Sequence, residues 1–268
     1  MAIGIGVNDK GQYVYHGDTF EIVMTRYSDP QRLNLARNAA RYLGKKDIDN
    51  IRRPLSIIRR YDVPEIFRGE HVEFEFHNVS KEVYDHIVTY TTRNMRVAGG
   101  NRALTSDDFT MPSDKVKNEW VVRQKIGDSM QNYKDLLDAG ETPQVARSAM
   151  PVNAKMNIFV YQFNFLTLGQ STFAQRIWEH GAQGNTVKVV QGMYELCIAM
   201  DKELWDTFYK YYGTPMMNWR EVHSKLEKKG LTMHQLAQLI FEERENYNPD
   251  ETVVDYLIRK FGERKSMW

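Results

Sequence analysis

The stretch EHVEFEFHNVS, residues 70–80, alternates apolar and polar side chains with a period of two. Val72, Phe74 and Phe76 fall on one face of that pattern. Because successive side chains of a β-strand point to opposite faces of its sheet, the pattern predicts a half-buried strand. Such a strand belongs to a sheet with one covered face.

Two other segments have the composition of strands, residues 19–29 (TFEIVMTRYSD) and residues 155–163 (KMNIFVYQF). Between the strand segments 19–29 and 70–80, residues 29–44 predict a helix with Pro30 in its first turn and Gly44 at its end. Strands and helices therefore occur in the same part of the chain.

Residues 111–140 predict a long amphipathic helix that Ser113 caps and Gly140 ends. Its apolar residues recur at helical spacing and mark the side expected to be buried: Val116, Trp120, Ile126, Met130, Tyr133 and Leu137. A short helix follows within residues 141–151, with Thr142 as its cap.

The rest of the chain is mainly helical in pattern, through most of residues 164–200 and again from Lys202 onward. Gly213 interrupts this pattern. We therefore expect an α+β fold with a helical majority. Residues 1–212 would form the α+β domain and residues 213–268 a helical C-terminal extension.

Composition argues against several classes of partner. The chain has 268 residues, of which 42% are hydrophobic, enough for a sizeable core. Its formal net charge is +1, so no global field attracts nucleic acid or an anionic membrane. No apolar run approaches the roughly 20 residues of a membrane helix. We expect no nucleic-acid partner and no membrane partner, and any anion has to be bound locally.

Cysteine and histidine usage suggests a cytoplasmic protein without a metal site. The single cysteine, Cys197, excludes an internal disulfide and lies in an apolar stretch typical of a small core residue. The N-terminus lacks the pattern of a signal peptide. The seven histidines are scattered, and no HExxH motif is present.

Residues 89–112, TYTTRNMRVAGGNRALTSDDFTMP, place arginines that include Arg96 and Arg102 around a Gly-Gly-Asn bend, residues 99–101. The segment before them, residues 79–88, has the spacing of a short helix that runs into this loop. Glycine lets backbone approach a ligand closely, so the loop is either a phosphate site or an ordinary solvated turn. These residues alone leave both possibilities open.

Two more arginines stand in segments of little charge. Arg147 precedes Pro151 in the short helix, and Arg176 lies in an apolar, amide-rich run. An arginine in such surroundings needs a buried anion or carbonyl group, or else an internal carboxylate partner. The basic segment from Arg52 to Arg60 has no such context, and a solvated helix face is its default interpretation.

Four segments, in the same order and with similar spacings, resemble the flavin-dependent thymidylate synthase family over approximately residues 20–212. They are EHVEFEFHNVSKEVYDHIV (70–88), LLDAGETPQVARSAMP (136–151), NFLTLGQSTFAQRIWEHGAQ (164–183) and DKELWDTFYKYYG (201–213). The resemblance implies a mixed sheet packed with long helices, and a homotetramer whose active sites are shared between subunits. It also implies transfer of a one-carbon unit from methylenetetrahydrofolate to C5 of dUMP. Hydride from FAD then reduces this unit, with NADPH as a further reductant.

For the nucleotide, the resemblance implies a set built around arginines. Arg176 is the predicted catalytic residue, because a fixed arginine would stabilise the negative charge that develops on the N3/O4 side of the ring. Arg147 would hold the nucleotide, and Arg96 or Arg102 would replace missing phosphate donors. The nucleotide-binding residues that the resemblance implies are His86, Arg96, Gly99, Gly100, Asn101, Arg102 and Arg147.

At the positions that contact flavin in the family, this sequence departs from the family signature R-H-R-x-x-S-x-N-E-x-S-x-R-Y. Thr89, Tyr90 and Thr91 stand where Arg-His-Arg is expected. Upstream, Phe67 stands for a flavin-contacting threonine, while Leu166 replaces an arginine farther along. The cofactor-binding residues that the resemblance implies in this sequence are Glu70, Thr89, Tyr90, Thr91, Asn164 and Gln170.

Three functions remain open at this point. The first is a pyrimidine deoxynucleotide C5 one-carbon transferase, by methylation of dUMP or by hydroxymethylation of dUMP or dCMP. Hydroxymethylation would need the folate carbon and water but no final hydride. The second is a catalytically inactive homologue that acts as a nucleotide-binding or assembly protein. The third is a fold-level similarity with an unrelated ligand, because fold alone does not fix function. We favour the first.

Overall fold

The computed structural model describes residues 3–213, except residues 61, 90–93, 101–106, 114 and 180–181, and beyond them only isolated positions between 223 and 235. The chain divides into two compact units, Met1–Thr214 and Pro215–Trp268. All the named helices and strands lie in the first unit. The predicted domain boundary after residue 212 stays a prediction.

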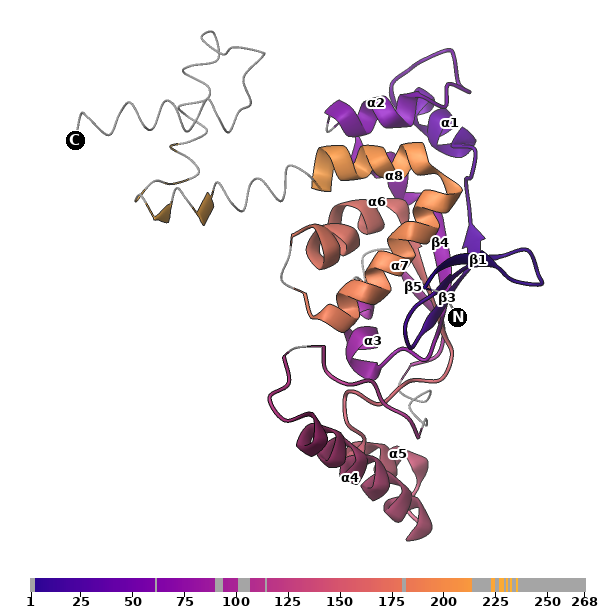
Figure 1. The fold of residues 1–268 in the computed structure, drawn as a ribbon. Helices are drawn as coiled ribbons and strands as arrows, with labels where there is room; N and C mark the ends of the chain where they lie inside the picture. Colours follow the sequence, from indigo (N-terminus) through magenta and orange to yellow (C-terminus); the bar gives the residue numbers. More distant parts are fainter. Residues whose placement is uncertain are drawn as a thin grey trace. The chain divides into compact units, whose positions relative to one another are not determined.

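A six-stranded sheet forms the centre of the first unit, in the strand order β1-β2-β3-β4-β6-β5 (Figure 1). The strands are β1 Gly4–Val7, β2 Tyr13–His16, β3 Glu21–Tyr27, β4 His71–His77, β5 Met95–Ala98 and β6 Phe159–Asn164. Every described pairing is antiparallel, and short connections join β1 to β2 and β2 to β3. The α+β class is confirmed, and the sheet is antiparallel rather than mixed.

Strand β4 confirms the alternation predicted for it. Val72, Phe74 and Phe76 are fully buried, and the residues between them are half-buried. Strand β3 also falls within its predicted segment, and β6 extends one residue beyond the end of its own. The predicted strands do not include β1, β2 or β5, each of which has only four residues. In β1, Ile5 and Val7 do alternate with glycines, but both side chains are exposed.

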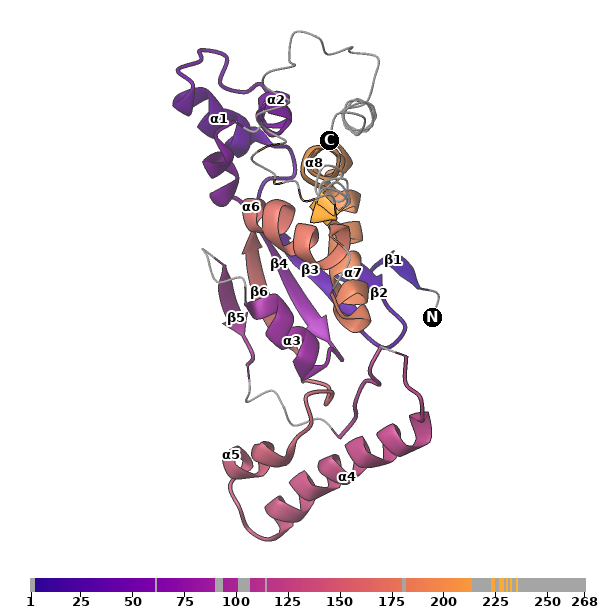
Figure 2. The same ribbon diagram turned by 90° about the vertical axis from the view of Figure 1, so that its left-hand side faces the viewer.

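Helices accompany the sheet in the order that the sequence predicts. They are α1 Leu33–Tyr42, α2 Arg53–Arg60, α3 Lys81–Val88, α4 Glu119–Asp138, α5 Pro143–Ala146, α6 Phe165–Thr167, α7 Gly184–Met200 and α8 Lys202–Phe208. Helix α7 packs against β2, β3 and α3, and Figure 2 shows α3 and α7 in front of the strands. None of the described helices combines the length and apolar character needed to cross a membrane.

Helix α1 begins at Leu33 rather than at Pro30. Arg32 has a left-handed backbone conformation, with a φ of 60°, so the chain enters the helix only after it. The carboxylate of Asp29 accepts the backbone N–H of Leu35 at 2.9 Å and satisfies one donor of the first turn. The proline therefore belongs to the turn that precedes the helix.

Helix α4 also begins later than predicted, at Glu119. Asn118 caps it, because its side-chain oxygen accepts the backbone N–H of Val121 at 3.2 Å. Ser113, the predicted cap, instead accepts the backbone N–H of Asn185 at 3.0 Å and so caps the first turn of α7. The prediction that Ser113 caps α4 is therefore wrong, because its hydroxyl caps a helix about 70 residues away.

The predicted buried side of α4 is only partly buried. Ile126, Met130 and Tyr133 are buried, whereas Trp120 is 70% exposed. Helix α4 packs against α5 and against η3 Arg147–Ala149, and these short elements cover only part of its length. Figure 2 shows α4 and α5 together below the strands, as an arm of the unit.

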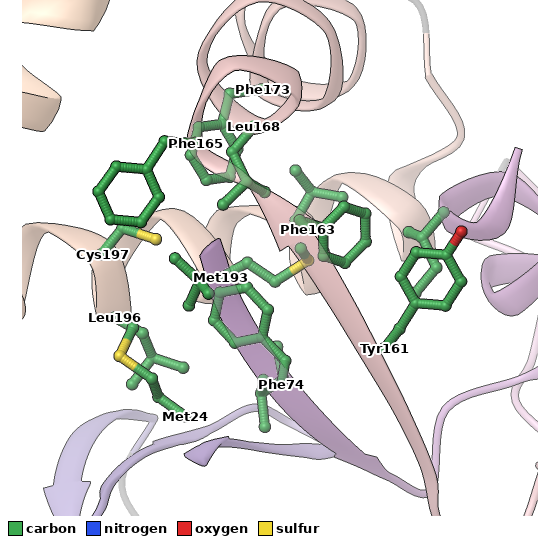
Figure 3. Close-up of a cluster of buried hydrophobic side chains, with 14 of the residues drawn as sticks. Met24, Phe74, Tyr161, Phe163, Phe165, Leu168, Phe173, Met193, Leu196 and Cys197 are labelled. Carbon is green, nitrogen blue, oxygen red and sulfur yellow. The ribbon is translucent and has the colours of Figure 1, made fainter. Parts of the chain in front are cut away.

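Aromatic side chains fill the core between the strands and helices α6, α7 and α8 (Figure 3). The rings of Tyr161 and Phe163 lie 4.8 Å apart, and Phe74 meets Phe163 edge-on at 6.3 Å between centroids. Cys197 of α7 is fully buried in the same cluster, and burial raises the pKa of its thiol well above the usual value. Cys197 is a small core residue, as expected.

Replacing Phe74 with alanine should lower the free energy of unfolding by about 3–5 kcal/mol, because a large buried ring is lost and a cavity remains. Tyr42→Ala is the matched control, since Tyr42 is 67% exposed, and it should change the free energy by less than about 0.5 kcal/mol. Urea denaturation followed by tryptophan fluorescence measures both. Equal losses in the two variants would contradict the described core.

Candidate functional site

The carboxyl end of helix α3 is where the predicted catalytic arginine is fixed. The last four carbonyl groups of a helix lack partners within the helix. At this end, the carbonyl oxygen of His86 accepts a hydrogen bond from Nη2 of Arg176 at 3.1 Å. It also accepts one from Oγ1 of Thr89 at 2.8 Å. The negative end of the helix dipole favours a guanidinium here.

The side chain of His86 ties the same helix to α7. Its Nδ1 lies 2.8 Å from Oγ1 of Thr186, a fully buried residue in the first turn of α7. Arg176 belongs to the π-helical segment η5, Ala174–Trp178, which also packs against α7. His86 thus joins three elements, through its carbonyl to η5 and through its imidazole to α7.

Arg96 and the glycine pair form a second cluster at the edge of the sheet. Nη1 of Arg96 donates to the hydroxyl of Tyr84 at 3.2 Å, and this bond raises the pKa of Arg96. Gly100 has a φ of 126°, and a Cβ there would lie 3.0 Å from the Arg96 guanidinium. Gly99 has a φ of 89°, and a Cβ there would lie 2.3 Å from Cβ of Phe159. Both positions therefore require glycine for reasons of packing.

The two clusters lie on different sides of α3. Tyr84 and His86 are two residues apart on the helix, and side chains at that spacing do not face each other. Arg96 bonds the hydroxyl of Tyr84 and therefore lies on the Tyr84 side of the helix. Arg176 bonds the backbone carbonyl of His86 and therefore lies at the end of the helix. These members of the predicted nucleotide set therefore gather around one helix without meeting at one point.

Arg147 lies at the other end of α3, on the arm. It begins η3, which packs against α4 and α5. The arm joins the amino end of α3 through backbone hydrogen bonds, from Lys81 N to the Ala154 carbonyl at 2.9 Å and from Glu82 N to the Val152 carbonyl at 2.8 Å. Nε of Arg147 is buried and has no hydrogen-bond partner among the described residues. An arginine donor in this state favours an incoming anion.

Every described residue of the predicted cofactor set makes a hydrogen bond inside the chain. Glu70 is buried and accepts from the hydroxyl of Ser28 at 2.5 Å. Thr89 donates to its own helix, as above. Gln170 makes a side-chain hydrogen bond with Tyr212.

Asn164 has two such partners. Its Oδ1 accepts the backbone N–H of Thr167 at 2.8 Å and so caps α6, and its Nδ2 donates to Oδ1 of Asn94 at 2.9 Å. Phe67, at a position that contacts flavin in the resembling family, is 1% exposed and packs edge-on against Phe208 at 5.1 Å. Both side chains have structural roles that the sequence does not reveal.

Four predicted site residues, Tyr90, Thr91, Asn101 and Arg102, lie outside the described residues. Sequence reasoning also misses Tyr84 and Thr186, which hold Arg96 and His86 in place. No local signal identifies them, because each acts on a residue of another segment, and Thr186 lies 100 residues from His86. Within the part of the chain that is described, no three His, Cys, Asp or Glu side chains gather as a metal ion requires.

Comparisons with known proteins agree with the fold. The sequence profile of the family described as "thymidylate synthase complementing protein" matches residues 23–201. The crystal structure of the UMP/dUMP methylase PolB from Streptomyces cacaoi, bound with 5-Br dUMP, is similar with a TM-score of 0.59. It has 14% sequence identity, and the match covers 72% of this chain and 96% of that chain. At this identity the likeness shows the fold alone. No curated protein matches the sequence.

His71 should make stability fall in mild acid. Burial first, and then Arg26, lower the pKa of His71, while the Glu70 carboxylate opposes them. The folded chain therefore binds this proton less tightly than the unfolded chain. Its contribution is complete above about pH 6.5 and is lost as the pH falls below that value.

Thermal unfolding at about pH 7.5 and about pH 5.5 measures this dependence. His71→Gln should lose less stability on acidification than the wild type. The control is His77→Gln, since His77 bonds Glu75 at 2.8 Å at the other end of β4. An unchanged acid dependence in His71→Gln would refute the assignment.

Proposed function

Since the chain belongs to the family of thymidylate synthase complementing proteins, the flavin-dependent thymidylate synthases, we propose that it transfers a one-carbon unit to C5 of a pyrimidine deoxynucleotide. The observation that carries this proposal is the guanidinium of Arg176, held on the His86 carbonyl at the end of α3. The similar crystal structure is of a UMP/dUMP methylase bound with 5-Br dUMP, which supports a pyrimidine nucleotide as the ligand.

The role of Arg176 follows from the chemistry of the pyrimidine ring. C5 attacks a carbon electrophile only weakly unless negative charge develops on the N3/O4 side of the ring. A preorganised cation there stabilises that charge and lowers the barrier. The His86 carbonyl fixes one guanidinium nitrogen, so the group needs little reorganisation when the charge appears. His86 acts as a positioning residue, and its bond to Thr186 steadies α3.

Phosphate binding falls to Arg147 and Arg96 in this proposal. Arginine binds phosphate bidentately, and Arg147 has a buried donor that the described residues leave unsatisfied. Arg147 and Arg176 lie toward opposite ends of α3, and we propose that a complete site takes Arg147 from one subunit and Arg176 from another. The homotetramer with shared sites that the family resemblance implies would supply such a pair.

The surface of the arm is suited to such an assembly. It exposes large apolar side chains, with Trp120 at 70% and Val145 at 46% exposure. Large apolar side chains exposed at both ends of such an arm are available for contact with another chain. A second copy of the chain that covers them would also bring its own nucleotide residues to the arm.

Flavin does not fit the described residues of the predicted cofactor set. Glu70 has a carboxyl group, Thr89, Asn164 and Gln170 have a hydroxyl or amide group, and all four already bond within the chain. A flavin dinucleotide carries a diphosphate that favours cationic or free backbone donors. The proposed reaction therefore uses neither FAD nor NADPH.

Hydroxymethylation suits such a site better than methylation. A bond forms between C5 and the folate one-carbon unit, and the C5 proton leaves. Water then adds to the transferred carbon as tetrahydrofolate departs. This sequence has no net oxidation or reduction, so methylenetetrahydrofolate and water are sufficient. The base, uracil or cytosine, is decided by the assay below.

Release of tritium from [5-³H]dUMP or [5-³H]dCMP with methylenetetrahydrofolate should detect the reaction. Arg176→Ala should lower the rate by about 10²-fold or more, because charge stabilisation in the transition state is lost. The control is Arg123→Ala, which removes only an exposed pair with Glu119 on α4. Nucleotide binding without tritium release in the wild type would instead support the catalytically inactive homologue. Full activity in Arg176→Ala would refute the role of this arginine.

The visible absorbance of the purified protein tests the flavin argument. We expect no oxidised flavin band, and no band retained after incubation with FAD and dUMP followed by gel filtration. Replacing Thr89 with arginine, the residue of the family signature, is the matched variant and should not by itself restore FAD binding. A retained flavin band in the wild type would show that the chain builds a flavin site after all, and methylation would become the preferred reaction.

A further inference from the structure

The basic segment from Arg52 to Arg60, most of which forms α2, lines a hollow that the proposed function does not use. The hollow has a volume of about 240 Å³ and lies between the end of α1, the following loop and α2. Figure 1 shows α1 and α2 side by side. Its charged and polar lining includes Lys45, Asn50, Arg52, Arg53, Arg60 and Asp62. The segment is thus more than a solvated helix face.

Helix α2 presents its charges to this hollow because its other side is committed to the core. Leu55 and Ile58 are buried and lie outside the lining. On the outer side, Arg59 is exposed and lies outside the lining, whereas its neighbour Arg60 lines the hollow. Adjacent arginines therefore differ in what they face, which provides a matched pair for experiment.

One wall of the hollow is held rigidly by Asp47. Arg53 donates through Nη1 to the Asp47 carbonyl at 2.7 Å and pairs through Nη2 with its carboxylate. Asn50 donates to the same carboxylate at 3.1 Å and accepts the backbone N–H of Arg52 at 3.1 Å. The bonds from Asn50 and Arg53 lower the pKa of Asp47, which therefore stays ionised and keeps the loop in place.

Three other basic side chains of the lining have donors available to a ligand. Arg53 is neutralised by Asp47, but Lys45, Arg52 and Arg60 form no ion pair within the described part of the chain. Asp62 is the one carboxylate among the described lining residues. A local excess of positive charge in a concave wall attracts and concentrates anions, although the whole chain has a net charge of only +1.

We infer that this hollow binds a small oligophosphate anion, a diphosphate or triphosphate group. Arginine forks match phosphate oxygens in pairs, and Lys45 adds a point charge. The volume lies below the about 300–1,000 Å³ of pockets for drug-sized ligands, so the phosphate chain fits and a larger body projects outward. The cationic side chains of the described lining match the charge of a phosphate chain.

Isothermal titration calorimetry of the full chain with sodium tripolyphosphate tests this inference. Arg60→Gln should weaken binding about tenfold, because a charge-assisted hydrogen bond is lost. Arg59→Gln, the adjacent control, should change it less than about twofold. Arg60→Lys should recover part of the affinity, which separates a lost contact from a folding defect. Binding should weaken as salt is added.

A parallel titration with UTP distinguishes the sources of the phosphate. Equal affinity for UTP and tripolyphosphate assigns the site to the phosphate chain alone, and clearly tighter UTP binding assigns it to a nucleotide. Tritium release from dUMP should be unchanged in Arg60→Gln, so a failure here is distinct from a failure of the proposed activity. Absence of tripolyphosphate binding, or equal weakening by Arg59→Gln and Arg60→Gln, would overturn the inference.

Discussion

The hydrogen bond from Arg176 to the His86 carbonyl is the interaction on which the functional account depends. It exists because a helix ends there. The final turn of α3 leaves carbonyl oxygens without intrahelical partners, and these oxygens attract a guanidinium both directly and through the helix dipole. A strong, permanent cation is thereby fixed at one point of the fold. The orientation of the Arg176 guanidinium is set by a backbone carbonyl, which few side-chain substitutions can disturb.

The fold supports this point from two directions. Helix α7 packs on the sheet and on α3, and Thr186 in its first turn holds the His86 imidazole. On the other side of α3, Tyr84 lies edge-on to Phe159 at 4.9 Å and holds Arg96. A single short helix therefore organises two arginines, each through an aromatic or heteroaromatic residue of that helix. The aromatic core between the sheet and the helices fixes the position of α3 relative to Arg96 and Arg176.

The sequence predicts the elements whose residues repeat with a clear period, such as Phe74 and Phe76 of β4. It fails where the decisive contact is distant, as with Ser113, which caps α7 rather than α4. It also fails where the rest of the chain covers only part of a helix, as with Trp120 of α4, which is 70% exposed. For the site, family resemblance points to Arg176 and Arg147, but not to their placement toward opposite ends of α3. Nor does any local pattern show that Asn164 caps a helix. That role depends on the chain passing from β6 directly into α6 at this residue.

The most direct test is to locate the nucleotide itself. A crystal of the full chain with 5-bromo-dUMP, measured at the bromine absorption edge, would mark C5 by its anomalous signal. The account predicts a bromine peak beside the pyrimidine ring contacted by Arg176 of one subunit, with the phosphate on Arg147 of another. A peak in the hollow between α1 and α2, or a ring far from Arg176, would contradict the assignment of this arginine to C5 chemistry.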